Sequence, residues 1–261
     1  MTPDGTCLPA GPPGERIGRG QGSEDEKARY VRRMFGAIAP RYDFTNALIS
    51  GGLHLRWKRA TAALAQAPAG GRALDVCCGT GDLAFLLARH VGPRGRVLGV
   101  DISLEMLHLA RRKAASARVR TKVEFALGDA EALGLPDAAF DAATVGFGVR
   151  NTLHPEAALR EIHRVLRPGG RLAVLEFSTP KNVVVRRLYD WYSFTVMPWV
   201  GRLASRHDDA YLYLPASVRA WPDQGAFAAM MTGAGFEQVR YVNLLTGITT
   251  IHVGVRPARG R

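Results

Sequence analysis

Residues 73–101 constrain the fold of this chain more than any other segment. An apolar run ends in Cys-Cys-Gly-Thr-Gly at 77–81, an amphipathic segment follows, and a second apolar run ends in Asp101. A strand, a glycine turn, a helix and a second strand form a βαβ unit, in which the two strands are parallel. The sequence therefore predicts an α/β fold with the turn and Asp101 at one edge of a parallel sheet.

The parts of this unit suit a nucleoside cofactor. Gly79 and Gly81 let the backbone turn tightly and approach a ligand closely. The helix expected from Asp82 presents unpaired N–H groups at its start. Asp101, at the tip of the second strand, can accept hydrogen bonds from both ribose hydroxyls.

The glycine turn alone leaves two cofactors open, because residues 79–84 read G-x-G-x-x-A, which an NAD-binding fingerprint also satisfies. Three features favour S-adenosylmethionine: Asp75, which can reach a ligand amine, Gly-Asp-Ala at 128–130, and Leu-Arg-Pro-Gly-Gly at 166–170. Together they resemble the class I S-adenosylmethionine-dependent methyltransferases, which have a Rossmann-like, mostly parallel seven-stranded sheet. The residues expected at the cofactor are Asp75, Gly79, Thr80, Gly81, Asp101, Ile102, Asp129, Ala130 and Gly146.

Length and composition fit one α/β domain in a reducing cytoplasm. The chain has 261 residues, 47% of them hydrophobic, enough for one substantial core. Its three cysteines, at 7, 77 and 78, form no metal-binding or disulfide pattern, so we expect no metal. Neither a signal peptide nor a run of 18 apolar residues is present.

The net charge of +12 indicates an anionic partner, either nucleic acid or a membrane surface. The alternative is that the positive charges are only solvated and bind no partner. No compact basic run with interleaved aromatic residues is present in the core, so nucleic acid is not expected. We expect a cytoplasmic protein that associates peripherally with the inner face of the cell membrane. Whether the chain forms a homodimer is an open question at this stage.

The order of patterns predicts three regions. Residues 1–24 read as a disordered tail, 25–70 as a helical cap, and 71–261 as the methyltransferase domain. Asp43 is a candidate N-cap of the second cap helix. In the domain we expect strands at 72–77, 96–101, 122–127, 140–146 and 171–177, helices at 82–91, 103–114 and 155–166, and a closing hairpin at 237–244 and 248–256.

An insertion at 180–222 differs in character from the rest of the domain. Apolar and aromatic residues crowd into 183–199, and arginines at 186, 187, 202 and 206 border them. This pattern favours a substrate lid that touches an anionic membrane interface, although an ordinary packed helix would also produce it.

Two long motifs, at 42–57 and 164–178, resemble the quinone-biosynthesis C-methyltransferases, and shorter matches extend the resemblance from about residue 27 to the C-terminus. Thr45 stands where that family usually has Met. The resemblance implies methylation of a polyprenylated hydroquinone. The Cys-Cys-Gly-Thr turn favours demethylmenaquinol, with a polyprenyl-benzoquinol of ubiquinone biosynthesis as the alternative. A methyltransferase acting on a soluble molecule, a sterol or RNA, or a non-catalytic S-adenosylmethionine-binding partner, is a more distant reading.

The same resemblance implies that Arg150, Asn151 and Tyr42 carry the chemistry. Arg150 ends the fourth expected strand and would stabilise a phenolate, while the proton leaves to solvent or a neighbouring carboxylate. Tyr42 would close the cap over the methionine end of the cofactor. His154 stands at a position where the family varies, so we do not expect it to be the base.

Overall fold

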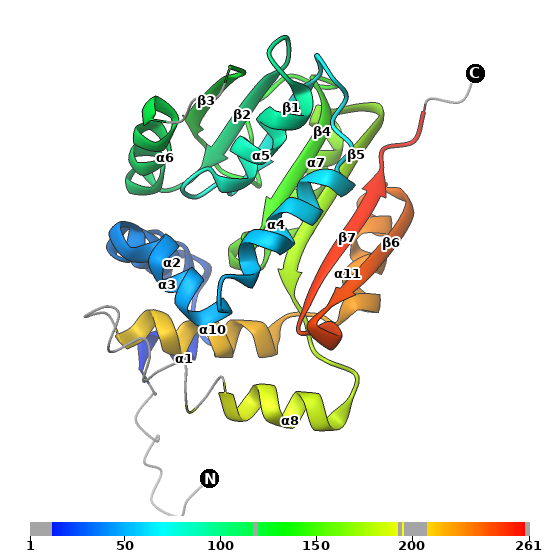
Figure 1. Cartoon of the computed structure of the whole chain (residues 1–261). Helices are drawn as coiled ribbons and strands as arrows, with labels where there is room; N and C mark the ends of the chain where they lie inside the picture. Colours follow the sequence, from blue (N-terminus) through cyan, green and yellow to red (C-terminus); the bar gives the residue numbers. More distant parts are fainter. Residues whose placement is uncertain (1–11, 117–119, 193–194, 196–207, 259–261) are drawn as a thin grey trace, which may run out of the picture.

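The computed structural model describes residues 12–116, 120–192, 195 and 208–258. Its centre is a seven-stranded sheet in the order β3-β2-β1-β4-β5-β7-β6, in which β7 runs antiparallel to both of its neighbours (Figure 1). The strands are β1 Arg72–Val76, β2 Arg96–Asp101, β3 Lys122–Leu127, β4 Phe140–Gly146, β5 Leu166–Phe177, β6 Glu237–Leu244 and β7 Thr249–Val255. The predicted parallel sheet with a closing hairpin is confirmed.

Both faces of the sheet are covered, which explains why its central strands are almost continuously apolar. Along β5, Leu172 and Val174 pack with α7 and α11 on one face, while Ala173 and Leu175 pack with α4 and α5 on the other. The flanking helices are α4 Leu53–Leu64, α5 Asp82–Val91, α6 Leu104–Ser116, α7 Pro155–Val165 and α11 Gln224–Gly233. The strand order reverses between β1 and β4, and ligands bind at such a switch point.

β5 begins earlier than the predicted strand at 171–177. Leu166 already pairs with Phe140 of β4, and pairing resumes at Arg171 opposite Ala142. The Arg-Pro-Gly-Gly between them bulges out, and the amide of Gly169 donates to the carbonyl of Arg256 at 2.8 Å. The expected turn is therefore a bulge inside one strand, because both of its flanks stay paired with β4.

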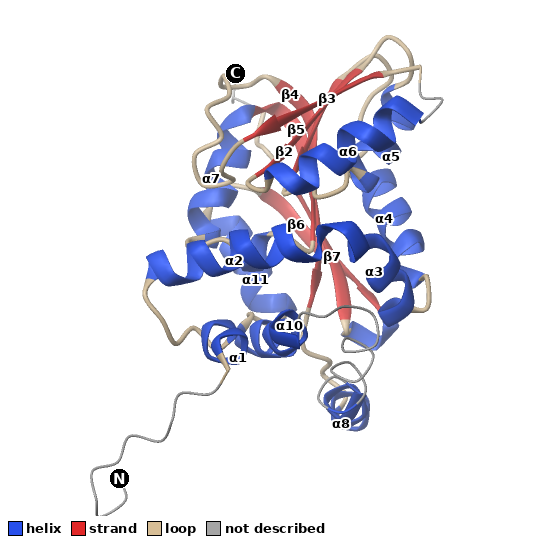
Figure 2. Cartoon of the chain, turned by 90° about the vertical axis from the view of Figure 1, so that its left-hand side faces the viewer, coloured by secondary structure: helices blue, strands red, loops and turns tan. Residues whose placement is uncertain are grey.

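The helical cap consists of α2 Glu24–Ile38, the 3₁₀ turn η1 Ala39–Arg41, α3 Tyr42–Ser50 and the start of α4. Pro40 interrupts the helical run. The next helix, α3, begins at Tyr42, so Asp43 lies in its first turn and is not the N-cap that the sequence predicted. α2 and α3 lie between α6 and the pair formed by α1 Pro13–Gly18 and α10 Asp208–Ala220 (Figures 1 and 2). The cap therefore covers the switch point of the sheet.

The prediction of a disordered tail up to residue 24 is wrong for the part that the structure describes. Residues 13–18 form α1, whose Ile17 is buried in a cluster with Val31 of α2 and Tyr213 of α10. No local pattern indicates this packing, because Tyr213, the partner of Ile17 on α10, lies almost 200 residues later. Residues 1–11 lie outside the described part of the chain.

In the insertion at 180–222 the structure describes two helices, α8 Val183–Trp191 and α10. Of the predicted aromatic cluster, Phe194, Val196, Met197 and Trp199, like Arg202 and Arg206, lie outside the described residues. α8 lies at the periphery of the molecule, below α10 in Figures 1 and 2. Among the helices described here, none combines the length and apolar character needed to cross a membrane.

Candidate active site

Two cavities meet under the helical cap. One, of about 910 Å³, lies over the carboxyl ends of β1, β2 and β4, and the other, of about 860 Å³, lies between the cap, β5 and α10. Phe35, Tyr42 and Phe147 line both cavities and form the wall between them. A ligand in the first cavity can therefore face a ligand in the second across this wall.

The first cavity collects most of the residues predicted to bind the cofactor, together with two of the predicted catalytic residues. These are Gly79, Asp101, Ile102, Asp129, Ala130, Gly146, Tyr42 and Asn151. They come from the ends of several strands, which converge at the switch point because the sheet is parallel there.

Asp101 links the glycine turn to the end of β2. Its Oδ2 accepts the Gly79 amide at 2.7 Å, and its Oδ1 accepts the Ser103 amide at 2.9 Å. Burial raises the pKa of Asp101, although these backbone amides act in the opposite direction. Each carboxylate oxygen has a second lone pair, so Asp101 can hold the turn and still accept a ribose hydroxyl.

The walls of the first cavity fit a cationic nucleoside. A Cβ built on Gly79 would have only Tyr42 within 4.0 Å, so the glycine leaves the space at the turn open. Three carboxylates, Asp101, Asp129 and Glu131, line the cavity. Such an edge attracts a sulfonium and repels a pyrophosphate, which favours the predicted S-adenosylmethionine over NAD.

Three of the predicted cofactor residues do not line this cavity. Gly81 is packed against Phe125, and a Cβ there would come within 2.9 Å of that ring. The Thr80 hydroxyl, which is buried, donates to Asp43 Oδ1 at 2.7 Å. Asp75 lies beneath the turn. These residues shape the turn, and their contacts in the described structure are with other parts of the protein.

Asp75 is a buried carboxyl group with one free oxygen. Its Oδ1 accepts the Thr144 hydroxyl at 2.8 Å, while no described group bonds its Oδ2. Burial raises the pKa of Asp75 to about 7, against smaller opposing effects of Thr144 and Lys58. The sequence placed this carboxylate next to a ligand amine; the structure shows that it is 1% exposed below the cavity wall.

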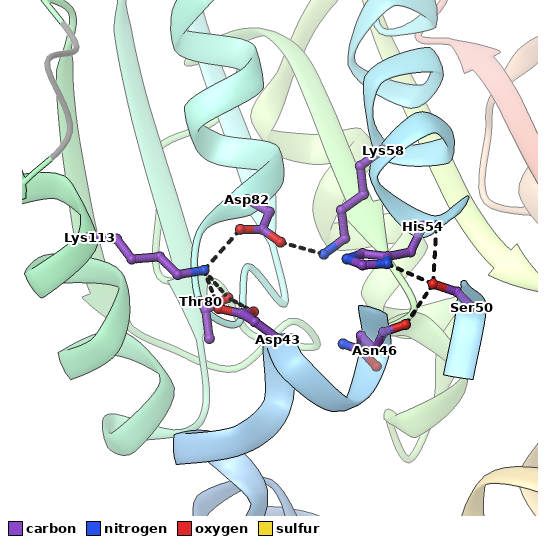
Figure 3. A network of polar contacts seen from close by, with 8 residues as sticks. All are labelled: Asp43, Asn46, Ser50, His54, Lys58, Thr80, Asp82 and Lys113. Carbon is purple, nitrogen blue, oxygen red and sulfur yellow. Dashed lines mark hydrogen bonds and ion pairs between the residues drawn. The ribbon is translucent and has the colours of Figure 1, made fainter. Parts of the chain in front are cut away.

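A polar network attaches the cap to the glycine turn (Figure 3). Lys113 of α6 contacts Asp43 of α3 at 2.5 Å, Thr80 at 2.9 Å and Asp82 of α5 at 3.0 Å. Asp82 also pairs with Lys58 of α4 at 2.8 Å. Burial alone would raise the pKa of Asp82, but the two lysines lower it to about 2, so this carboxylate stays charged.

The second cavity has an apolar interior with a buried ion pair at one side. Arg150 Nη1 contacts Glu176 Oε1 at 2.5 Å, and Arg150 Nε donates to the Ser217 hydroxyl at 3.1 Å. The guanidinium also lies over the ring of Phe177, 5.4 Å from its centroid. Burial raises the pKa of Glu176, and Arg150 opposes that shift. The hydrogen bonds of Arg150 to described residues use Nε and Nη1, which leaves Nη2 able to donate into the cavity that Arg150 lines.

Asn151 and Tyr42 take different positions from Arg150. The Asn151 amide donates to the Phe147 carbonyl at 3.1 Å and accepts the Tyr213 hydroxyl at 2.9 Å, so it braces the wall between the cavities. Tyr42 lies in that wall, and burial raises the pKa of its hydroxyl.

Sequence reasoning missed Glu176 as a site residue, although a signal for it existed. A lone carboxylate ends the apolar run of β5, as Asp101 ends that of β2. Phe147 and Tyr213 carried no such signal, because aromatic residues are more often part of an apolar core. Their place at the cavities depends on how the cap and α10 pack.

Comparisons with known proteins find relatives that match most of the chain. The model of the ubiE/COQ5 methyltransferase family matches residues 22–256. The chain is 45% identical over 234 residues to the ubiquinone/menaquinone biosynthesis C-methyltransferase UbiE of Pseudomonas putida, covering 90% of this chain and 91% of that one. It is 46% identical to the UbiE of Ectopseudomonas mendocina, with the same coverage. A solved methyltransferase from Aquifex aeolicus, described as SAM-dependent, shares the fold, with a TM-score of 0.58, 18% identity, and coverage of 78% of this chain and 92% of that one.

Asp75 predicts a pH-dependent stability. Its folded-state pKa of about 7 lies above the ordinary value of 3.8, so the folded protein binds the extra proton and loses stability as the pH rises between these values. Three pH units correspond to roughly 4 kcal/mol as an upper estimate. In urea unfolding, Asp75→Asn should therefore gain stability relative to wild type as the pH rises from 5 to 8.

The exposed Asp137, paired with Arg164 on the surface, provides the control. The free energy of unfolding of Asp137→Asn should differ from that of wild type by the same small amount at every pH from 5 to 8. A difference for Asp75→Asn that does not change with pH would show that the carboxyl is ionised throughout.

Proposed function

Because the chain belongs to the ubiE/COQ5 methyltransferase family, we propose that it methylates a ring carbon of demethylmenaquinol to give menaquinol, the last step of menaquinone biosynthesis. Its cofactor is S-adenosylmethionine. The main support for the proposal is that Phe35, Tyr42 and Phe147 line two adjacent cavities. One of these cavities suits a nucleoside, and the other is apolar. A polyprenylated hydroquinone, which is apolar except at its hydroxyls, suits the second cavity.

A benzoquinol of ubiquinone biosynthesis is the second candidate, supported by the double designation of the relatives, ubiquinone/menaquinone. The two substrates share the hydroquinone ring and the prenyl tail and differ in the fused ring. The Cys-Cys-Gly-Thr turn favours the naphthoquinol, and Cys77 of that turn lines the cofactor cavity.

Each residue of the first cavity would contact a different part of the cofactor. Bound S-adenosylmethionine supplies an electrophilic methyl group on a cationic sulfur. Asp101 is placed to accept the ribose hydroxyls, and Asp129 to accept the adenine amine, since both carboxylates line the cavity. Tyr42 and Phe147, which line both cavities, would bracket the methyl group.

In the second cavity the protein must position an electron-rich ring and keep it dry. Only the reduced quinol has a hydroxyl that can lose its proton and pass negative charge to the neighbouring ring carbon. Phe147, Phe177 and Tyr213 line the cavity and exclude water from it. Good positioning can lower the barrier by about 7–11 kcal/mol. The free Nη2 of Arg150 would stabilise the phenolate, because its charge is permanent.

We further propose that α8 docks on an anionic membrane surface, where the prenylated substrate resides. Its apolar residues Val184, Leu188 and Trp191 share one face and are 74%, 64% and 59% exposed. Arg187 is exposed at the edge of this face, and Arg186 is exposed on the opposite side of the helix. An apolar face with a cation at its edge matches the acyl boundary and the phosphate layer of a membrane.

α8 also lies near the substrate cavity. Tyr192, directly after α8, donates its hydroxyl to the Ile49 carbonyl at 2.9 Å, and the Ile49 side chain lines the second cavity. A quinol entering from a membrane beneath α8 would therefore have a short path to the site.

The methylation itself is tested with purified protein, S-adenosylmethionine and demethylmenaquinone, with and without a reductant. We expect methyl transfer only when the quinone is reduced. A parallel assay with a demethylated benzoquinol compares the two candidate substrates through kcat/KM. Asp101→Ala, which loses the ribose contacts, serves as the low-affinity control. Equal turnover of the oxidised quinone would contradict the phenolate route, and cofactor binding without any turnover would support a non-catalytic role.

Arg150→Lys should lower kcat about 100-fold and leave the cofactor Kd nearly unchanged. A lysine keeps the charge near Glu176 but lacks the planar fork that also reaches Ser217 and the cavity. His154→Ala is the control, since the side chain of His154 is 54% exposed and His154 lines neither cavity. The assigned role fails if Arg150→Lys, with an unchanged Tm, turns over like wild type.

The membrane proposal is tested by flotation with vesicles of neutral or anionic lipid at low and high salt. Replacing Arg186 and Arg187 by Gln should weaken binding to anionic vesicles roughly thirty-fold, at about 1 kcal/mol for each residue. Arg89 and Arg94, exposed near the other end of α5, form the matched control pair. Binding that ignores lipid charge and salt would contradict the electrostatic part.

A further inference from the structure

His54, near the start of α4, lies at the polar side of the apolar cavity. It is 5% exposed and lines the cavity together with Tyr42, Lys58 and Arg150. It lies within the 42–57 motif, to which no separate role for this histidine was attached. Its hydrogen bonds show whether it is only a packed core residue or can also act on a ligand.

The contacts of Ser50 fix the tautomer of His54 (Figure 3). The Ser50 hydroxyl donates its single hydrogen to the Asn46 carbonyl at 2.6 Å. The 2.7 Å contact between Ser50 Oγ and His54 Nδ1 must then take its hydrogen from Nδ1. In the neutral ring the other nitrogen, Nε2, therefore carries a lone pair, and no described residue forms a hydrogen bond with it.

The charges around His54 keep the ring neutral. Burial lowers the pKa of His54 below its ordinary value, and the Lys58 ammonium lowers it further, against the opposing Asp82 carboxylate. The groups that face His54 from the neighbouring elements are Tyr42 and Asp43 of α3, Lys58 of α4, Asp82 of α5, Lys113 of α6 and Arg150 of η2 Val149–Asn151. Near pH 7 the imidazole is therefore an acceptor at Nε2.

The other titratable groups of the apolar cavity all hold their protons. Burial raises the pKa of Tyr42, and it raises that of Tyr213 to about 12. Burial alone would lower the pKa of Lys58, but Asp82 and Tyr42 raise it overall. Arg150 is permanently charged, and the carboxylate of Glu176 does not line the cavity. Of the described residues in this lining, His54 alone offers a free base.

We propose that His54 is the general base that takes the proton from the hydroquinone hydroxyl; this inference rests on the proposed function. The O–H bond breaks, its electron pair stays on oxygen, and the proton bonds to Nε2. The ring carbon then takes the methyl group, and the bond between that group and the cofactor sulfur breaks with its electron pair staying on sulfur. Nε2 returns its proton to the oxygen and accepts the proton of the methylated carbon, so that the ring regains aromaticity. The protonated imidazole releases this proton to solvent after the product leaves. Ser50 is a positioning residue that holds the acceptor tautomer.

The test compares wild type with His54→Gln, using reduced demethylmenaquinol. We expect kcat to fall by at least 100-fold, the usual scale of general-base catalysis, with the cofactor Kd and Tm close to wild type. In wild type, kcat should also fall toward acidic pH, at pH values below the ordinary histidine range, because the ring becomes protonated and its pKa is lowered by burial and by Lys58. This acidic limb should be absent from the residual activity of His54→Gln.

Further variants separate a base from a merely structural histidine. Added imidazole should restore part of the activity of His54→Ala but not of Arg150→Lys. Ser50→Ala should lower kcat, and Ser50→Thr, which keeps the hydroxyl, should restore it. His90→Gln is the matched control, because His90 is exposed on α5 and bonds only the Leu86 carbonyl among described groups.

The outcomes distinguish the two proposals. If wild type methylates no hydroquinone, the proposed function fails, and with it this inference. If wild type is active and His54→Gln keeps its kcat and its acidic limb, the proposed function stands and the assignment of His54 is wrong. If His54→Gln unfolds, the test rests on imidazole rescue of His54→Ala and on the variants Ser50→Ala and Ser50→Thr. The proposal is overturned if imidazole does not raise the activity of His54→Ala and Ser50→Ala has the kcat of wild type.

Discussion

The ammonium group of Lys113 holds the cap onto the sheet. It contacts oxygens of Asp43, Thr80 and Asp82, which come from the cap, the glycine turn and the start of α5. An exposed ion pair contributes little by itself, but here one cation joins three elements, and Lys58 extends the network through Asp82. Tyr42 precedes Asp43 in α3, so the same contacts place its ring in the wall between the cavities.

This arrangement places two chemical environments next to each other. The first cavity has carboxylates at Asp101, Asp129 and Glu131, while the second is lined mainly by apolar and aromatic residues. A cationic methyl donor and an apolar ring acceptor would each find a suitable environment, and water would be excluded between them. In such a low-dielectric site each charge acts more strongly than it would in water.

The site also contains charges and polar atoms that are costly to bury. Arg150 and Glu176 form an ion pair with side chains 5% and 1% exposed, and one oxygen of Glu176 has no described partner. Buried pairs of this kind rarely add much net stability. Asp75, with a raised pKa, adds a further cost beneath the turn. Their concentration at the two cavities fits a functional site, where perturbed groups commonly gather.

The sequence by itself determined the sheet, the glycine turn and the carboxylates at the strand ends, because these depend on local patterns. Alternating strand and helix segments predicted five parallel strands and the closing hairpin, and the turn, Asp101 and Asp129 were predicted at one edge of the sheet, where the structure has a cavity. Gly146, which lines the same cavity, was expected from the family resemblance. Each signal needs only neighbouring residues, since a strand and the turn that follows it are continuous in the chain.

Tertiary structure alone decided which side chains meet. Arg150 pairs with Glu176, 26 positions later, Thr80 bonds Asp43 of the cap, and Ile17 is buried against Tyr213. Asp75 lies in the interior because both faces of the sheet are covered. The acceptor nitrogen of His54 follows from a hydrogen-bond chain through Ser50 and cannot be read from the residue type. Such pairings depend on distances in the folded chain, which no local pattern records.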